Sequence, residues 1–135
     1  MRILVCGDRR WTDYGMIWKE LVERLPIELV IHGGARGADA LAGRAARELG
    51  IPVSEFPAEW SRYGRAAGPI RNRRMLDEGK PDLVLAFHND INRSLGTRNM
   101  VRQAVEAGVP VEVVGDQLWL LEYMFGRHWT RTYVR

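Results

Sequence analysis

The residues with the clearest chemical potential are 31–39, which read Ile-His-Gly-Gly-Ala-Arg-Gly-Ala-Asp. The three glycines permit positive φ angles and a close approach of the backbone to a bound group. The stretch follows an apolar run and precedes a helical pattern, so its amides would face an anion at the positive end of the helix dipole. Arg36 could add a two-pronged contact to the same oxyanion. The sequence therefore predicts a phosphate-binding loop for a nucleotide-like ligand, built from Gly33, Gly34, Ala35, Arg36, Gly37 and Asp39.

Other polar side chains are predicted at the same edge of a sheet, because each follows an apolar run of strand type. Ligands of open parallel sheets bind outside the carboxyl ends of the strands, where the strand order reverses. For Asp8 the sequence leaves open a turn cap or a contact with a ribose or base, and for Trp60 loop anchoring or stacking on a base. Thr97 suits a helix N-cap, phosphate binding, or both. The candidates at this edge are Gly7, Asp8, Arg9, Glu59, Trp60, His88, Asn89, Asp90, Gly96 and Thr97.

Several candidates also have purely structural interpretations. Asp39 lies in the first turn of a predicted helix, where a carboxylate suits the helix dipole without any ligand. His32 and His88 are single histidines at strand ends and lack the spacing of metal ligands, so we expect both to be structural. We expect no metal site and no cofactor. Arg71 and Asn72 begin the third predicted helix on the side of the site, within a basic run that is otherwise typical of a solvated face.

The elements that must position these residues are five short apolar runs alternating with helix-like segments. The runs are continuously apolar, as in strands buried on both faces. Such alternation indicates βαβ units with right-handed crossovers. The sequence predicts an α/β fold, a single Rossmann-like three-layer sandwich with a mainly parallel five-stranded sheet. The predicted strands are 2–6, 29–31, 53–56, 83–87 and 111–114, and the predicted helices are 15–25, 38–49, 69–78 and 97–107.

The composition fits one domain, since 135 residues that are 46% hydrophobic can bury a core of ordinary size. The formal charge is +3, but the basic residues are spread along the chain and do not by themselves identify an anionic partner. The single cysteine, Cys6, excludes an internal disulfide and is expected to be a buried strand residue. No apolar run approaches the roughly 18 residues of a membrane-spanning helix. The chain also begins with a strand pattern in place of a signal peptide, so we expect a cytoplasmic protein without membrane association.

Residues 115–135 depart from the alternating pattern, because they are dense in large apolar side chains. Two interpretations are open: a final helix packed on the sheet, or a contact surface in an oligomer. We therefore divide the chain into a Rossmann-like domain, residues 1–114, and an aromatic-rich C-terminal extension, residues 115–135. The large side chains of the extension include Leu118, Trp119, Leu120, Leu121, Tyr123, Met124, Phe125, Trp129 and Tyr133.

Five separated motifs occur in order along residues 1–114 and together resemble the YspA-like branch of the SLOG superfamily. This Rossmann-like group contains the LOG phosphoribohydrolases and the DNA-processing protein DprA. The resemblance implies a nucleotide-binding pocket with residues 33–39 and 96–97 near phosphate and with Arg71 and Asn72 as ligand contacts. LOG-like relatives also imply a homodimer. The motifs are Gly7-Asp8-Arg9, residues 32–39, Pro57-Ala-Glu-Trp60, Gly68-Pro-Ile-Arg-Asn72 followed by Met75, and Gly96-Thr97.

One departure from the LOG enzymes bears on chemistry. Their Pro-Gly-Gly-x-Gly-Thr-x-x-Glu motif corresponds here to residues 92–100, which keep Gly96 and Thr97 but end in Met100. Cleavage of a glycosidic bond passes through an oxocarbenium-like state that a carboxylate can stabilise and a methionine cannot. The LOG reaction by this residue is therefore disfavoured, and any carboxylate for catalysis would come from Asp8, Asp39 or Glu59.

Three functional interpretations follow, and whether the protein is an enzyme stays open. The leading one is a sensor or sequestering module that binds a nucleotide or nucleotide-derived small molecule. The second is a hydrolase acting on an N-glycosidic or phosphate bond, with Glu59 or Asp39 as acid or base. The third, from the basic pI and the kinship with DprA, is binding of single-stranded nucleic acid.

Overall fold

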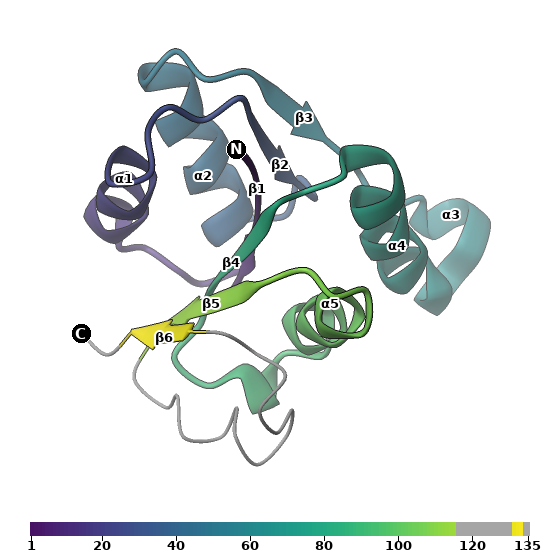
Figure 1. The fold of residues 1–135 in the computed structure, drawn as a ribbon. Helices are drawn as coiled ribbons and strands as arrows, with labels where there is room; N and C mark the ends of the chain where they lie inside the picture. Colours follow the sequence, from purple (N-terminus) through teal and green to yellow (C-terminus); the bar gives the residue numbers. More distant parts are fainter. Residues whose placement is uncertain (116–130, 134–135) are drawn as a thin grey trace.

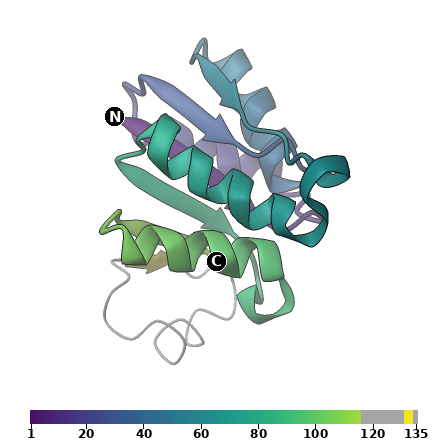
Figure 2. The same cartoon turned by 90° about the vertical axis from the view of Figure 1, so that its right-hand side faces the viewer.

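The structure is a computed structural model that describes residues 1–115 and 131–133. Its centre is a six-stranded sheet in the order β3-β2-β1-β4-β5-β6, in which every neighbouring pair is parallel. Helices cover both faces of this sheet, as the two views in Figures 1 and 2 show. The strands are β1 (Arg2–Gly7), β2 (Leu29–His32), β3 (Val53–Glu55), β4 (Leu83–Phe87), β5 (Val111–Val114) and β6 (Arg131–Tyr133).

The connections between strands are helical. The α-helices are α1 (Tyr14–Val22), α2 (Ala38–Glu48), α3 (Trp60–Tyr63), α4 (Ala67–Gly79) and α5 (Leu95–Glu106). Two short 3₁₀ turns, η1 (Gly64–Ala66) and η2 (Ile91–Arg93), precede α4 and α5. Within the described ranges, no helix is long and apolar enough to span a membrane.

The predicted Rossmann-like sandwich is confirmed, and each of the five predicted strands is present. A further short strand that was not predicted, β6, lies beside β5. Three residues within an aromatic-rich tail carry too little pattern to indicate a strand. The four-residue α3 was missed for the same reason. The final helix expected in the tail falls on residues 116–130, which lie outside the described residues.

The sheet is buried on both faces because alternate residues of each strand point in opposite directions. On β1, Ile3 and Val5 face α1 and α2, while Leu4 and Cys6 face α4 and α5. The face of α2 that packs on the sheet consists of small residues, which let the helix and the sheet lie close together. These are Ala38, Ala42, Ala45 and Ala46, each fully buried.

The strand order reverses between β1 and β4, which are neighbours in the sheet. The chain leaves β1 towards α1 on one face and leaves β4 towards α5 on the other (Figure 1). Gly7 ends β1 at this point with a φ of +153°. A Cβ at Gly7 would lie 2.3 Å from the Phe87 carbonyl oxygen and 2.8 Å from the Ala38 Cβ, so only glycine fits here.

Gly7→Ala is expected to destabilise the fold by about 3 kcal/mol or more, because the added methyl overlaps backbone that cannot yield. Gly96→Ala is the matched control, since its Cβ would meet nothing within 4 Å in the described residues. The control should change the free energy of unfolding by less than about 1 kcal/mol. Urea denaturation of both variants measures this difference, and equal stabilities would contradict the close packing described for Gly7.

Candidate functional site

A cleft of about 1180 Å³ opens at the carboxyl ends of β1 and β4, where the strand order reverses. Its walls come from α3, from the start of α4 and from the start of α5. This is the place that parallel α/β sheets offer to ligands. Ten of the predicted ligand-binding residues line it: Gly7, Asp8, Arg9, Ala35, Asp39, Trp60, Arg71, Asn72, Gly96 and Thr97.

Five predicted site residues are not brought to the cleft: Gly33, Gly34, Arg36, Gly37 and Glu59. Glu59 is exposed and lies 3.9 Å from Arg62 within its own turn. Gly34 and Gly37 have positive φ, as expected. The atoms that leave no room for a side chain at these positions are protein atoms, so the glycines are needed without any ligand. A Cβ at Gly37 would lie 2.3 Å from the carbonyl oxygen of Asp8.

The glycine loop, residues 33–37, binds the carboxylate of Asp39, a residue of the same chain. The N–H groups of Gly33 and Ala35 donate to Asp39 Oδ2 at 3.0 and 3.2 Å, and Gly34 N–H donates to His32 Nδ1 at 3.0 Å. The sequence predicts the anion of a ligand at this loop, and in the structure the carboxylate of Asp39 occupies two of its amides. A carboxylate from the first turn of α2 is always within reach and satisfies these amides without any ligand.

Arg71 fastens this loop to the wall of the cleft. Its Nη1 donates to the Gly33 carbonyl oxygen at 2.6 Å and to the Phe56 carbonyl oxygen at 3.3 Å. Its Nε donates to Asn72 Oδ1 at 3.0 Å. Burial lowers the Arg71 pKa, and the nearby Asp39 carboxylate partly restores it. The side chain lines the cleft, yet most of its donors are committed to the protein.

Asn72 performs a similar task for α5. It is 3% exposed and donates from Nδ2 to Asn99 Oδ1 at 3.1 Å and to the Gly96 carbonyl oxygen at 3.4 Å. Gln103 also donates to Asn99 Oδ1, at 2.8 Å. This chain of amides fixes the first turn of α5 against α4.

The start of α5 is open to the cleft. Ser94 is the N-cap, accepting from Thr97 N–H at 3.3 Å and donating to Thr97 Oγ1 at 3.0 Å. The N-cap expected at Thr97 therefore lies three residues earlier, at Ser94. Thr97 itself is buried. Leu95 and Gly96 are exposed, and their N–H groups have no partner among the described residues. Free amides at a helix start are the arrangement that binds anions.

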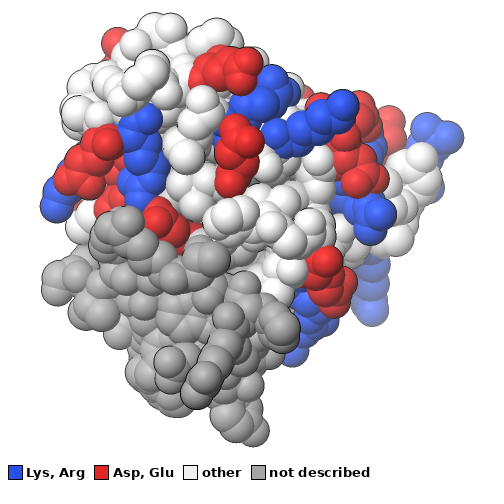
Figure 3. Space-filling view, viewed as in Figure 1, with Lys and Arg blue, Asp and Glu red and all other residues white. Residues whose placement is uncertain are grey.

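Seven arginines but only three carboxylates line the cleft. The carboxylates are Asp8, Asp39 and Asp90. On the face seen in Figure 3 basic and acidic groups are interspersed, so the outer surface shows no comparable basic stripe there. Arg98 and Arg102 are spaced i, i+4 just after Gly96, a signal that sequence analysis could have used. The seven are Arg9, Arg10, Arg65, Arg71, Arg93, Arg98 and Arg102.

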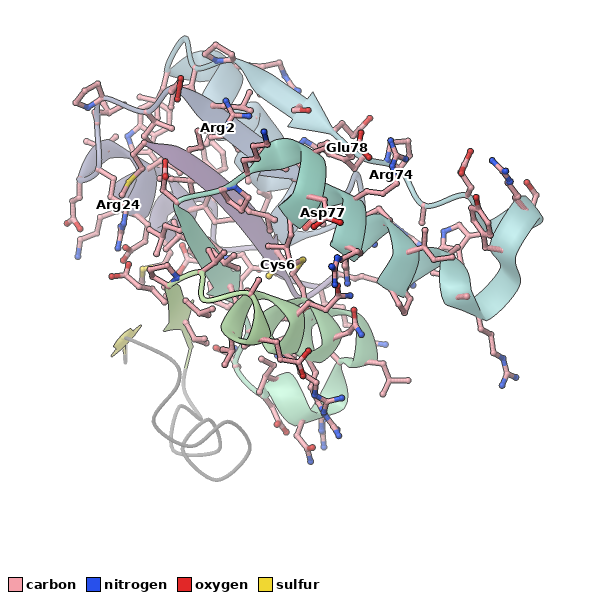
Figure 4. The ribbon with its side chains drawn as sticks, turned by 45° about the vertical axis from the view of Figure 1, so that its right-hand side comes forward. Arg2, Cys6, Arg24, Arg74, Asp77 and Glu78 are labelled. Carbon is pink, nitrogen blue, oxygen red and sulfur yellow. The ribbon has the colours of Figure 1, made fainter. Side chains whose placement is uncertain are left out.

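The floor of the cleft is apolar and carries no ionised side chain. Met100, at the position of the LOG glutamate, is 1% exposed and packs in the core cluster with Met75 and Cys6. Cys6 lies on β1 between α4 and α5 (Figure 4) and is buried, as predicted. Burial, followed by the Asp39 charge, raises the pKa of its thiol, which keeps it protonated. No metal-ligand group of three His, Cys, Asp or Glu gathers in the described part of the chain.

Asp39 gives this site a testable electrostatic signature. Burial raises its pKa from the ordinary 3.8 to about 6, against the opposing effect of the Ala35 and Gly33 N–H groups and Arg71. The folded state thus binds this proton more tightly than the unfolded chain does. The stabilisation from the protonated group is complete below pH 3.8 and is lost as the pH rises through 6.

Asp39→Asn removes this titration and keeps an oxygen that can accept from the loop amides. The unfolding free energy of the wild type relative to this variant should fall by on the order of 2 kcal/mol between pH 4 and pH 7. Urea denaturation over this pH range measures it. Asp77→Asn, the same charge change on the exposed side of α4, is the control. A difference that does not vary with pH would contradict the effect of burial on Asp39.

Comparisons with known proteins agree with this architecture. A family model described as "YspA, cpYpsA-related SLOG family" matches residues 1–63. The Gene 61 protein of Mycobacterium phage D29 is 42% identical over 125 residues, covering 86% of this chain and 98% of the phage protein. The match to the family model includes the segment from β1 to α3, which carries the glycine loop.

Among solved structures, DNA processing protein A (DprA) from Streptococcus pneumoniae matches with a TM-score of 0.71 and 16% sequence identity. The match covers 98% of this chain but 58% of the DprA chain, so it shows a shared fold within a longer protein. The family and the fold fit a function related to nucleotides or nucleic acids. The chain belongs to the YspA, cpYpsA-related SLOG family.

Proposed function

We propose that the protein binds a nucleotide or nucleotide-derived ligand in the cleft and acts as a sensor or sequestering module. The observation that carries this proposal is the convergence of seven arginines on one cleft beside an open helix start. The side chains of four of them, Arg9, Arg10, Arg65 and Arg102, make neither an ion pair nor a hydrogen bond with any described residue. Cations without partners around a concave site suit a multiply charged anion.

The start of α5 is the best place for a phosphate group. The free amides of Leu95 and Gly96 and the side chain of Arg98 all belong to its first turns, and the helix dipole adds to their attraction. Gly96 leaves room for close approach, because a Cβ there would meet nothing within 4 Å. We favour this position over the glycine loop, where Asp39 occupies the amides of Gly33 and Ala35 and His32 occupies that of Gly34.

Two exposed apolar side chains at the margin of the cleft suit a nucleobase. Trp60 is 52% exposed and Leu95 is 82% exposed, and both line the cleft. The Trp60 ring reaches over the start of α4, since a Cβ at Gly68 would lie 3.5 Å from it. Large exposed apolar side chains next to a polar site commonly pack against the flat face of a ligand.

Binding is favoured over hydrolysis because neither of the carboxylates expected to act as acid or base, Glu59 and Asp39, is free at the cleft. Met100 stands where the LOG glutamate would be, and Glu59 lies outside the cleft. Asp39 lines the cleft but is committed to the amides of the glycine loop. Stacking and ion pairing need none of these groups.

The direct test is titration calorimetry with nucleoside mono-, di- and triphosphates, NAD and ADP-ribose, after a thermal-shift screen of the same compounds. A ligand at 100 times its dissociation constant stabilises the folded state by roughly 2.7 kcal/mol, which a melting curve resolves. We expect at least one class to bind below the millimolar range. Absence of binding across the whole panel would refute the proposal.

Gly96→Asp tests the placement of the phosphate. A carboxylate in the first turn of α5 suits the helix dipole, so the fold should be retained, but it repels an anion at the cleft. Nucleotide affinity is expected to fall at least tenfold. Ala40→Asp is the matched control, because it adds the same charge to the first turn of α2, at an exposed position that does not line the cleft. Equal affinities in the two variants would place the phosphate elsewhere.

Single-stranded nucleic acid is a second candidate, supported by the likeness to a protein named for DNA processing and by the same arginines. Its phosphate backbone would contact the arginines of the cleft, and the affinity for it would fall steeply as the salt concentration rises. Fluorescence anisotropy of labelled oligonucleotides at 50 and 200 mM salt tests this candidate. Weak binding that does not depend on salt would remove it.

A further inference from the structure

Asp8 and His88 occupy corresponding positions on the two strands that flank the reversal of strand order. Each is the first residue after its strand, and the preceding residues, Gly7 and Phe87, are partners in the sheet. Asp8 N–H donates to the Phe87 carbonyl oxygen at 2.9 Å, which holds the two turns together. Both side chains line the cleft.

The hydrogen bonds of His88 determine which of its nitrogens carries the proton. Nδ1 accepts from Asp90 N–H at 2.9 Å, so its lone pair is in use. Burial lowers the pKa of His88, against the opposing charges of Asp8 and Asp90, and favours the neutral ring. A neutral ring that accepts at Nδ1 has its hydrogen on Nε2. Nε2 is therefore a donor, and it lies 4.0 Å from Asp8 Oδ2.

Asp8 presents the complementary acceptor. Its backbone oxygen accepts from Trp11 N–H and Ala38 N–H at 3.1 Å each, and its Oδ1 accepts from Arg10 N–H at 2.9 Å. These bonds fix the residue and leave Oδ2 on the side of His88. The side chain is 32% exposed, so the carboxylate is accessible from the cleft.

The two groups face each other without meeting. A separation of 4.0 Å is too long for a hydrogen bond but allows one oxygen atom to lie about 2.8 Å from both. Such an atom must accept from His88 and donate to Asp8, and a hydroxyl does both. An ionised phosphate oxygen has no hydrogen to donate and would be repelled by the carboxylate.

We propose that Asp8 and His88 form a hydroxyl subsite that binds either the 2′ or the 3′ hydroxyl of the ribose, so that the protein prefers ribonucleotides to the deoxy counterparts that lack this hydroxyl. This inference rests on the proposed nucleotide binding and names the sugar that the cleft selects. When the ligand lacks this hydroxyl, the His88 donor and the Asp8 acceptor must bind water or stay without a partner. Polar sites reject analogues that lack one group in this way, because the unpaired groups weaken binding.

The test is titration calorimetry with the four ribonucleoside triphosphates and with their 2′-deoxy and 3′-deoxy counterparts. For a triphosphate that binds, removal of one of the two hydroxyls should weaken binding at least tenfold. Equal affinities for all three sugars would overturn the hydroxyl subsite and leave nucleotide binding intact. No binding of any triphosphate would overturn the subsite, and a negative result in the wider nucleotide panel would overturn the proposed function as well.

Asp8→Asn provides the residue-level test. The amide keeps an acceptor for Arg10 N–H but replaces the second carboxylate oxygen with a donor, so the hydroxyl loses its acceptor. The ratio of ribo to deoxy affinity should fall to within about twofold of one, while the melting temperature stays near that of the wild type. Asp77→Asn, on the outer side of α4 (Figure 4), removes the same charge away from the cleft and should keep the ratio. An unchanged ratio in Asp8→Asn would contradict the assignment.

Discussion

The buried carboxylate of Asp39 is the interaction on which the rest of the site depends. It accepts from two amides of the glycine loop and lies near Arg71, which in turn binds the carbonyl oxygens of Gly33 and Phe56. The exits of β2 and β3 and the start of α4 are thereby joined through one charge. Ionisation of a group that is 6% exposed is unfavourable by itself, and these donors are what make it tolerable.

This arrangement favours the start of α5 over the glycine loop as the position for an anion. The Asp39 carboxylate occupies the amides of Gly33 and Ala35, while the start of α5 keeps free amides at the cleft. The amides of Asn72, Asn99 and Gln103 hold α5 in that position. The glycine loop therefore has a structural role beside the cleft. The ends of β1 and β4 and the start of α5 form the surface proposed for a ligand.

Much of this could be predicted from the sequence. Continuous apolar runs predict the strands, and their alternation with helices predicts that the strands are parallel, so a site at their carboxyl ends follows. The strand order and the position of its reversal were not predicted. The partner of the glycine-loop amides could not be predicted, since spacing alone does not tell whether Asp39 turns towards its own loop or away from it. Two of the cleft arginines were missed for another reason: Arg65 and Arg93 lie in 3₁₀ turns with no periodic pattern.

The alanine face of α2 has a consequence for how the protein can change. Ala38, Ala42, Ala45 and Ala46 let the helix lie close to the sheet, and Asp39 is carried on the same helix. A bulkier side chain at Ala42 would lift α2 and displace the Asp39 carboxylate together with the glycine loop. The shape of the cleft can therefore change through core substitutions outside it, so relatives with identical cleft residues need not share one cleft geometry.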